Sequence, residues 1–153
     1  MSLCLVAIIA SVVFALLMGW IIYLLCTRDK ASRKANSDSI SPRKKGEPVE
    51  IVGETQLNEL LDSGEAIMCM FWAPWCGHCK STKPKYMEAV RILGDGATCA
   101  LVNGDVPENA PLIKKYGIRG YPSILMLKKN EDHATYRGNR SSESIVDFHK
   151  SNN

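Results

Sequence analysis

The stretch Phe71-Trp72-Ala73-Pro74-Trp75-Cys76-Gly77-His78-Cys79-Lys80 decides the fold of this chain. The apolar run Ala66–Trp72 precedes the first cysteine and has the length of a buried strand. The next segment, Lys80–Leu93, has the pattern of a helix. Cys76 is therefore expected at the mouth of a helix, where unpaired backbone N–H groups and the helix dipole favour negative charge.

A Cys-x-x-Cys pair at such a position indicates redox chemistry of the thiols. The thiolate is the nucleophile in thiol–disulfide exchange, and the helix terminus favours it at Cys76. A positive charge on His78 lowers the pKa of Cys76 further. We expect Cys76 to be the attacking sulfur and the more exposed one, and Cys79 to be the more buried sulfur that resolves the mixed disulfide. No bound cofactor is expected, because the Cys76–Cys79 dithiol itself carries the electrons.

Two other uses of this cysteine pair are open. Zinc needs about four ligands, and no second Cys-x-x-Cys or His-x-x-x-His follows, so the fold would have to recruit others from Cys69, Cys99 and His133. A structural disulfide across two residues constrains the unfolded chain little, and it gives Trp75 and His78 no role. We expect no metal and no purely structural bridge.

Three segments resemble a known family. Ala-Pro-Trp-Cys-Gly-His-Cys-Lys at 73–80 resembles the active site of the protein disulfide isomerase branch of the thioredoxin family. The likeness continues at Lys114–Ser123, which is similar to the Gly-Val-Arg-Gly-Tyr-Pro-Thr segment of that family, and reaches Tyr136–Arg140. The resemblance implies an α/β thioredoxin fold, with a central mixed sheet flanked by helices.

The resemblance also implies an activity and its residues. The expected reaction is the formation, reduction or shuffling of disulfides in protein substrates, with Cys76, Cys79 and His78 as the catalytic residues. Arg119 is expected to favour the thiolate of Cys79, and Pro122 to follow a cis peptide bond that faces the cysteines. Contact with substrate is expected from Trp75, Gly77, Gly120, Tyr121 and Pro122.

One departure from the family concerns proton transfer. Its members usually place a buried acid six positions before the first active cysteine, with a buried lysine on the next strand. Here these positions hold Met70 and Leu101. The loss of both charges together leaves neither one buried and unpaired. We expect slow release of mixed disulfides, which keeps open an alternative in which the fold holds partners without efficient turnover.

The periodicity of the remaining chain fits this architecture. Pro84 is expected to kink the helix after Cys79. Further strands are predicted at 49–52, 98–102, 123–128 and 134–137, and further helices at 55–61, 109–116 and 142–149.

The residues before this domain divide in two. Residues 3–26 carry no charged side chain and exceed the roughly 20 apolar residues that span a bilayer, so they predict one transmembrane helix. Residues 27–48 hold seven basic and three acidic residues and predict a flexible linker, in which residues 28–45 have the charge to contact anionic lipids. The domain is predicted at 49–153. It carries a net charge near −1 out of the chain's +3, which argues against nucleic-acid binding.

The compartment depends on the orientation of the predicted membrane helix. Disulfides persist in the lumen of the endoplasmic reticulum, and Asn139-Arg140-Ser141 is a glycosylation sequon that functions only there. The basic segment after the helix favours the opposite orientation by the positive-inside rule, with the domain in the cytosol as a reductase. We expect a luminal domain, with the cytosolic orientation as the alternative.

Overall fold

The computed structural model of this chain describes residues 17–20 and 46–153. Residues 17–20 are helical. The rest of the predicted membrane helix and most of the predicted linker lie outside the described residues. Within the described ranges no helix is long and apolar enough to cross a bilayer. Residues 46–153 form the domain that carries the Cys-x-x-Cys pair.

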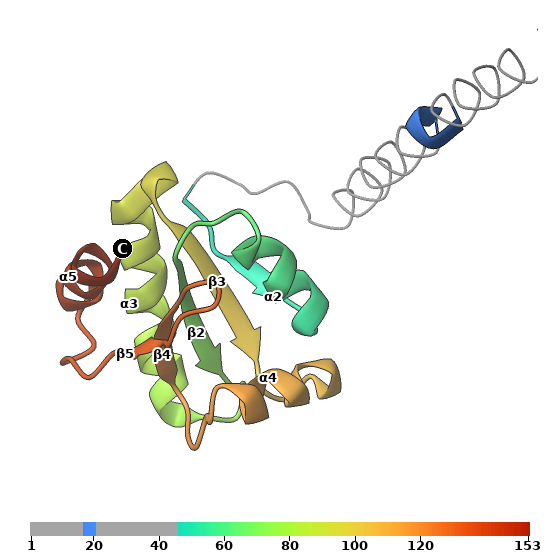
Figure 1. The fold of residues 1–153 in the computed structure, drawn as a ribbon. Helices are drawn as coiled ribbons and strands as arrows, with labels where there is room; N and C mark the ends of the chain where they lie inside the picture. The colour runs from blue at the N-terminus through green and yellow to red at the C-terminus, as the bar shows by residue number, and fades with distance from the viewer. Residues whose placement is uncertain (1–16, 21–45) are drawn as a thin grey trace, which may run out of the picture. The chain divides into compact units, whose positions relative to one another are not determined.

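A five-stranded mixed sheet forms the centre of the domain (Figure 1). Its strands are β1 (Val49–Ile51), β2 (Ile67–Trp72), β3 (Thr98–Asn103), β4 (Ser123–Leu127) and β5 (Ala134–Thr135). They lie in the order β1-β3-β2-β4-β5. β3 pairs in parallel with β1 and β2, whereas β4 pairs antiparallel with β2 and β5. The expected central mixed sheet is present, with β2 between β3 and β4.

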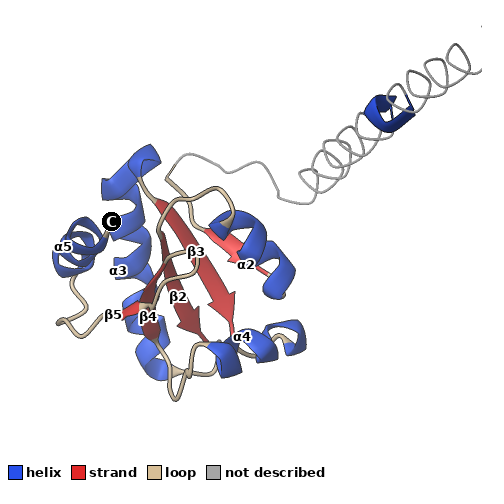
Figure 2. Ribbon diagram, in the orientation of Figure 1, coloured by secondary structure: helices blue, strands red, loops and turns tan. Residues whose placement is uncertain are grey.

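Helices cover both faces of this sheet (Figure 2). The elements are α2 (Glu54–Leu61), α3 (Gly77–Leu93), α4 (Ala110–Lys115) and α5 (Ser142–Asn152), with short 3-10 helices η2 (Gly94–Gly96) and η3 (Pro107–Asn109). α3 packs against α5 on one face, and residues of α2 and α4 belong to the core on the other. Each predicted helix and strand of the domain is present, with ends shifted by up to three residues.

Strand β2 shows why the sheet is covered twice. Successive side chains of a strand point to opposite faces. Met68 and Met70 pack with α3 and α5, whereas Ile67, Cys69 and Phe71 pack with α2 and α4. All five are fully buried. The continuous apolar run is thus the signature of a strand buried on both faces.

Met70 and Leu101 are register partners on the paired strands β2 and β3. Both side chains are buried in the core beside α3 and α5. Two apolar side chains thus stand at the positions where members of the resembled family usually have a buried acid and a buried lysine.

Two polar side chains fix the backbone around the ends of the strands. The Tyr86 hydroxyl lies 2.7 Å from the Met68 carbonyl and 3.0 Å from that of Ala100, which ties α3 to β2 and β3. The buried Asn109 amide donates to the carbonyls of Ile51 and Asn103, and its oxygen accepts from the Gly53 N–H. Asn109 therefore holds the carboxyl ends of β1 and β3 together. The loop that leaves β3 leads directly into the candidate site.

Candidate active site

Cys76 occupies the junction between β2 and α3. It is the N-cap of α3, with extended backbone angles and no side-chain capping bond. The helix begins at Gly77, three residues before the predicted start at Lys80. The predicted start is late because the first turn has no apolar periodicity to mark it. The prediction that Cys76 sits at the mouth of a helix is confirmed.

The surroundings of Cys76 lower the pKa of its thiol. The largest cause is a hydrogen bond from the Cys79 thiol, followed among the favourable ones by the backbone N–H groups of Cys79 and His78 and by the positive charge of Arg140. Burial opposes these effects. Donors that point at a sulfur stabilise its thiolate, so Cys76 forms a thiolate more readily than an ordinary cysteine.

Cys79 has the opposite proton affinity. Burial raises the pKa of its thiol to about 11, and the adjacent Cys76 sulfur acts in the same direction. Both sulfurs are thiols in this structure. Cys76 is 8% exposed and Cys79 1%, which confirms their predicted order. Ala73, Trp72 and Tyr121 pack against the pair and leave little of either sulfur exposed.

The loop before β4 closes the other side of the Cys76 sulfur. The Tyr121–Pro122 peptide bond is cis, as the resemblance implies. The Cys76 thiol donates to the Tyr121 carbonyl at 3.3 Å between sulfur and oxygen. The Ser123 hydroxyl donates to the Gly120 carbonyl, which holds the same loop against the start of β4. The structure thus brings Cys76 and Tyr121 together and places Gly120 and Pro122 in the adjoining loop.

An aromatic surface lies beside the sulfurs. Trp75 is 67% exposed, and its ring meets Tyr121 edge to face with 5.9 Å between ring centroids. The Trp75 indole N–H donates to the Asp105 carboxylate at 2.7 Å, which fixes an otherwise free side chain. Gly104 leaves room for the Tyr121 hydroxyl, which any larger residue at this position would displace. An exposed aromatic ring that its neighbours hold in place is a surface on which another chain can pack.

An apolar groove of about 330 Å³ lies on the Cys79 side of the site. Its walls are Trp72, Ala73, Pro74, Cys79, Lys80, Lys83, Pro84 and Met87. The Lys83 ammonium lies 3.4 Å from the centroid of the Trp72 ring. Pro84 lies inside α3, as predicted. No group of three or more metal-binding side chains is found among residues 17–20 and 46–153.

The domain matches known proteins along almost its whole length. A family model described as thioredoxin matches residues 48–151. This chain belongs to the thioredoxin family. Protein disulfide-isomerase 1 of Caenorhabditis elegans is 39% identical over 105 residues, which cover 68% of this chain and 21% of that protein. Human protein disulfide-isomerase A6 is 33% identical over 118 residues, or 76% of this chain and 26% of the human one.

Solved structures agree with this assignment. The first thioredoxin domain of mouse protein disulfide-isomerase A4 superimposes with a TM-score of 0.63 at 25% identity, covering 75% of this chain and 81% of that one. The chain spans about a fifth to a quarter of the length of the two curated relatives. It contains a thioredoxin domain related to protein disulfide isomerases.

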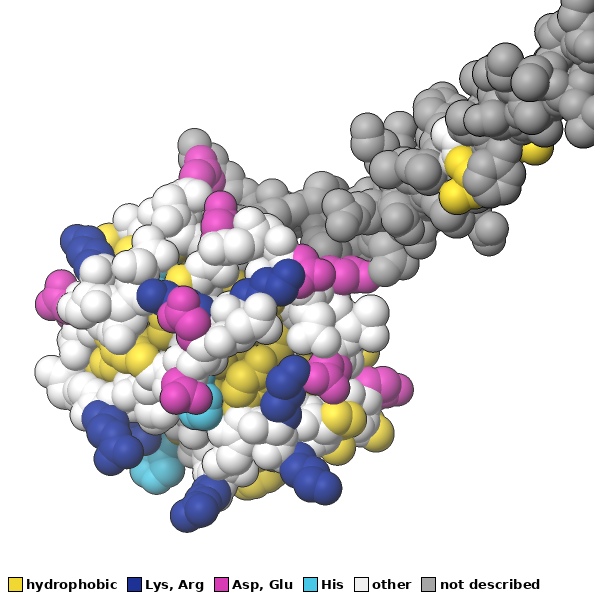
Figure 3. All heavy atoms as spheres, viewed as in Figure 1, with side chains coloured by type: hydrophobic (Ala, Val, Ile, Leu, Met, Phe, Trp, Pro, Cys, Tyr) yellow, Lys and Arg dark blue, Asp and Glu magenta, His cyan; other side chains and the backbone are white. Residues whose placement is uncertain are grey.

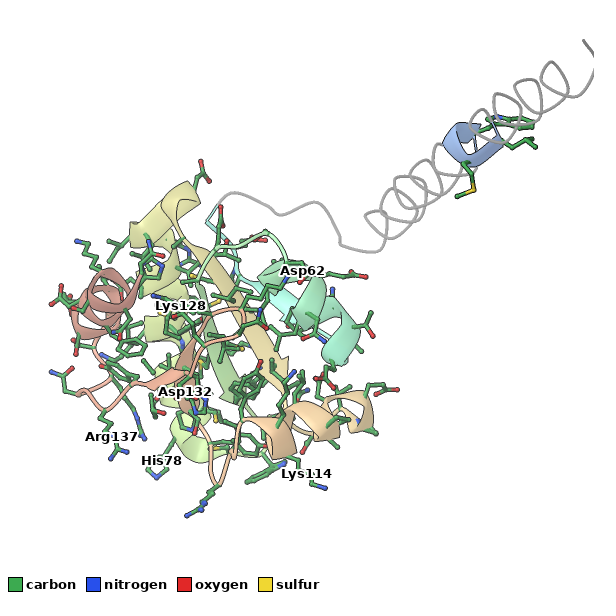
Figure 4. The ribbon with its side chains drawn as sticks, in the orientation of Figure 1. Asp62, His78, Lys114, Lys128, Asp132 and Arg137 are labelled. Atoms are coloured by element: carbon green, nitrogen blue, oxygen red, sulfur yellow. The ribbon has the colours of Figure 1, made fainter. Side chains whose placement is uncertain are left out.

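The charged residues of this thioredoxin domain differ in part from prediction. The arginine whose charge lowers the pKa of both active-site thiols is Arg140, so the role of Arg119 stays a prediction. His78 acts on Cys76 through its backbone N–H. Its imidazole is exposed and points away from the domain in Figure 4, so the predicted effect of its charge is also untested.

Sequence reasoning missed Arg140 and Asp105 as site residues. Arg140 lies more than sixty positions from Cys76, and its backbone adopts a φ of 61° in the loop before α5. That loop is held because the Arg140 N–H donates to the Tyr136 hydroxyl, which in turn donates to Ser144. The segment 136–140 did carry a signal, since it contributed to the family resemblance. Asp105 carried none.

Proposed function

We propose that this chain is a thiol–disulfide oxidoreductase of the protein disulfide isomerase type, acting on cysteines of protein substrates. The observation that carries the proposal is the split proton affinity of two adjacent sulfurs. Cys76 is shifted toward the thiolate at a helix terminus, and Cys79 is held as a thiol one turn later. The relatives named protein disulfide-isomerase support the same reaction class.

The geometry supports a two-step exchange. The Cys76 thiolate attacks one sulfur of a substrate disulfide, forms a mixed disulfide and releases the other substrate sulfur as a thiolate. Cys79 then loses its proton to solvent and attacks the Cys76 sulfur, which releases the second substrate thiol and leaves the Cys76–Cys79 disulfide. In the reverse direction, a substrate thiolate attacks this disulfide at Cys76.

Substrate contact is assigned to the surface around Cys76. Trp75 offers exposed aromatic area, the half-buried Tyr121 lies against it, and the loop of Gly120 and Pro122 is proposed to lie beside the bound chain. Gly77, at the first position of α3, adds no side chain that would obstruct access to Cys76. His78 and Arg119 are proposed to tune the pKa values of the two thiols.

The test is multiple-turnover exchange on a protein substrate. With a scrambled or reduced disulfide protein as substrate, the wild-type chain is expected to restore native disulfides over many turnovers. Cys76→Ala is expected to lose activity completely, and Cys79→Ala to accumulate one mixed disulfide per chain. A wild-type chain that exchanges no disulfides under these conditions would refute the proposal.

A second candidate function is suggested by Met70 and Leu101. Without an ionisable group at these buried positions, the deprotonation of Cys79 has no internal acceptor, and the mixed disulfide persists. In this case the domain captures partners covalently and turns over poorly. The turnover assay separates the two, because capture without release gives a single burst equal to the amount of chain.

We also propose that residues 3–26 anchor the chain in a bilayer and that the domain faces the lumen of the endoplasmic reticulum. The uncharged run supports the anchor, the sequon at Asn139 supports the lumen, and the basic residues 28–45 suit anionic lipid headgroups. Protease protection in intact microsomes, with endoglycosidase treatment, tests both. Digestion of the domain from outside would favour the cytosolic orientation.

A further inference from the structure

The charged side chains around the sulfurs have one dominant sign. Three segments meet at the site: the start of α3, the loop whose Tyr121 carbonyl accepts from Cys76, and the loop of Arg140, whose charge reaches both sulfurs. Their five cationic or protonatable side chains are here named the cationic rim: His78, Lys80, Arg119, Arg137 and Arg140. His78 and Lys80 lie in the first turn of α3, Arg119 precedes the Tyr121–Pro122 loop, and Arg137 and Arg140 lie between β5 and α5. All five are exposed.

The figures show the same asymmetry. His78 and Arg137 project from the lower edge of the domain in Figure 4. Along the lower margin of the face seen in Figure 3, the charged side chains are basic or histidine, and the acidic ones lie above them. The domain as a whole is nearly neutral, so this edge is locally positive.

The charges of the rim are available to a ligand. The described ion pairs join Lys115 to Glu54 and Lys129 to Asp62, and neither involves a rim residue. The acidic side chain closest to the site in the described contacts, Asp105, is engaged by the Trp75 indole. Among charged side chains, it is Arg140 whose field reaches both sulfurs and lowers the pKa of each.

We propose that the site selects protein segments in which acidic side chains flank the reacting cysteine. This rests on the exchange reaction proposed above and adds the substrate class. Carboxylates on either side of the substrate sulfur meet the rim while the sulfur reaches Cys76, and complementary charge raises the rate of encounter. The reactive sulfur at the centre favours a peptide over a nucleic acid as the ligand of this edge, because exchange with Cys76 needs a sulfur on the ligand.

The experiment compares three disulfide-linked peptide dimers that differ only in the residues flanking cysteine, which are Glu, Gln or Lys. Reduced full chain reacts with each dimer in a single turnover: Cys76 forms the mixed disulfide, Cys79 closes the enzyme disulfide, and two peptide thiols leave. Each rate is divided by the rate of the same dimer with uncharged dithiothreitol, which removes intrinsic differences in the leaving thiol.

The normalised rate is expected to rise from Lys to Gln to Glu, with the Glu dimer about tenfold faster than the Lys dimer at low salt. Salt at about 1 M, where the screening length is about 3 Å, is expected to remove the difference. Arg137→Gln with Arg140→Gln is expected to bring the ratio close to one. The matched control Lys150→Gln removes charge from the exposed surface of α5, away from the rim, and is expected to keep the ratio.

If Arg140 acted only through the pKa of Cys76, its loss would change the rates of all peptides equally. The ratio of the normalised rates of two peptides cancels such a change. Equal normalised rates, or a ratio that the rim variants leave intact, would overturn the selection of acidic segments. If a single-stranded oligonucleotide at low concentration slowed the reaction of the chain with the Gln dimer, this would also overturn the proposal and assign the rim to nucleic-acid binding. Absence of reaction with all three dimers would instead refute the oxidoreductase function itself.

Discussion

The domain holds two pairs of buried cysteines, and only one of the pairs contains a thiol whose pKa is lowered. Cys76 and Cys79 lie at the start of α3, whereas Cys69 and Cys99 lie within β2 and β3. The pKa of Cys76 is lowered, and burial raises the pKa of Cys69 far above its ordinary value. All four side chains are at least nine-tenths buried, so burial does not distinguish the pairs.

The difference lies in the backbone around each sulfur. N–H groups in the interior of a sheet are used by the neighbouring strands, and Cys69 and Cys99 pack on opposite faces of that sheet. In the first turn of α3 the N–H groups have no partner on a neighbouring strand, and those of His78 and Cys79 point at the Cys76 sulfur. A reactive thiol in this fold is therefore made by hydrogen-bond donors directed at the sulfur, first the Cys79 thiol and then the backbone N–H groups, and the residue type alone does not make one.

The largest expected effect is a difference in alkylation rate. In the reduced native chain, iodoacetamide is expected to modify Cys76 first, with the site read by peptide mass spectrometry. Cys69 and Cys99 are expected to react at least about a thousandfold more slowly, because they need global opening that costs about 5 kcal/mol or more. Denaturant should remove the difference. Native modification of Cys69 at the rate of Cys76 would contradict the comparison.

The second prediction concerns a charge introduced at Met70, between the buried core and the Cys76–Cys79 pair. Met70 lies in β2, two residues before Trp72, whose ring packs against both the core and the Cys76–Cys79 pair. Met70→Glu is expected to speed the resolution of the mixed disulfide by a factor on the order of ten to a hundred, since a positioned acid–base group typically contributes at least that much. Stopped-flow measurement of the intrinsic tryptophan fluorescence follows this step.

Met70→Gln is the matched control, with the shape of glutamate and no titratable proton. Its resolution rate is expected to equal that of the wild type. Circular dichroism establishes that both variants fold, because a buried carboxylate opposite Leu101 costs stability. Equal resolution rates in the folded Glu and Gln variants would refute the role assigned to the missing acid.

The same contrast shows how far the sequence leads. The apolar run 66–72 and the Cys-x-x-Cys pair were sufficient to predict β2, the site at the start of α3 and the order of burial of Cys76 and Cys79. They were not sufficient to predict Arg140 and Asp105, because these side chains reach the site through long-range packing that local periodicity does not encode. For Met70 and Leu101 the sequence predicted only that the family's two charges are missing. That the two residues are register partners depends on the pairing of β2 and β3.

The smallest expected effect is the pH dependence of stability that arises from the buried imidazole of His149. Burial favours the neutral form of any group, so it raises the pKa of Cys69 and lowers that of His149. His149 lies on α5 at 3% exposure, and its Nε2 has no hydrogen-bond partner among residues 46–153. The unfolded chain binds a proton at a pH near 6.5, where the folded domain still resists it. The stability contributed by neutral His149 is therefore present above that pH and is lost as the pH falls.

Urea unfolding between neutral and mildly acidic pH measures this loss. The wild type is expected to lose up to about 1.4 kcal/mol per pH unit below a pH of about 6.5, until the folded-state pKa is reached. His149→Leu is expected to flatten this part of the profile, because it removes the proton that only the unfolded state accepts. His133→Gln, at an exposed position, is the control for the replacement of a histidine. A His149→Leu profile as steep as that of the wild type would show that burial of this imidazole does not limit stability at acidic pH.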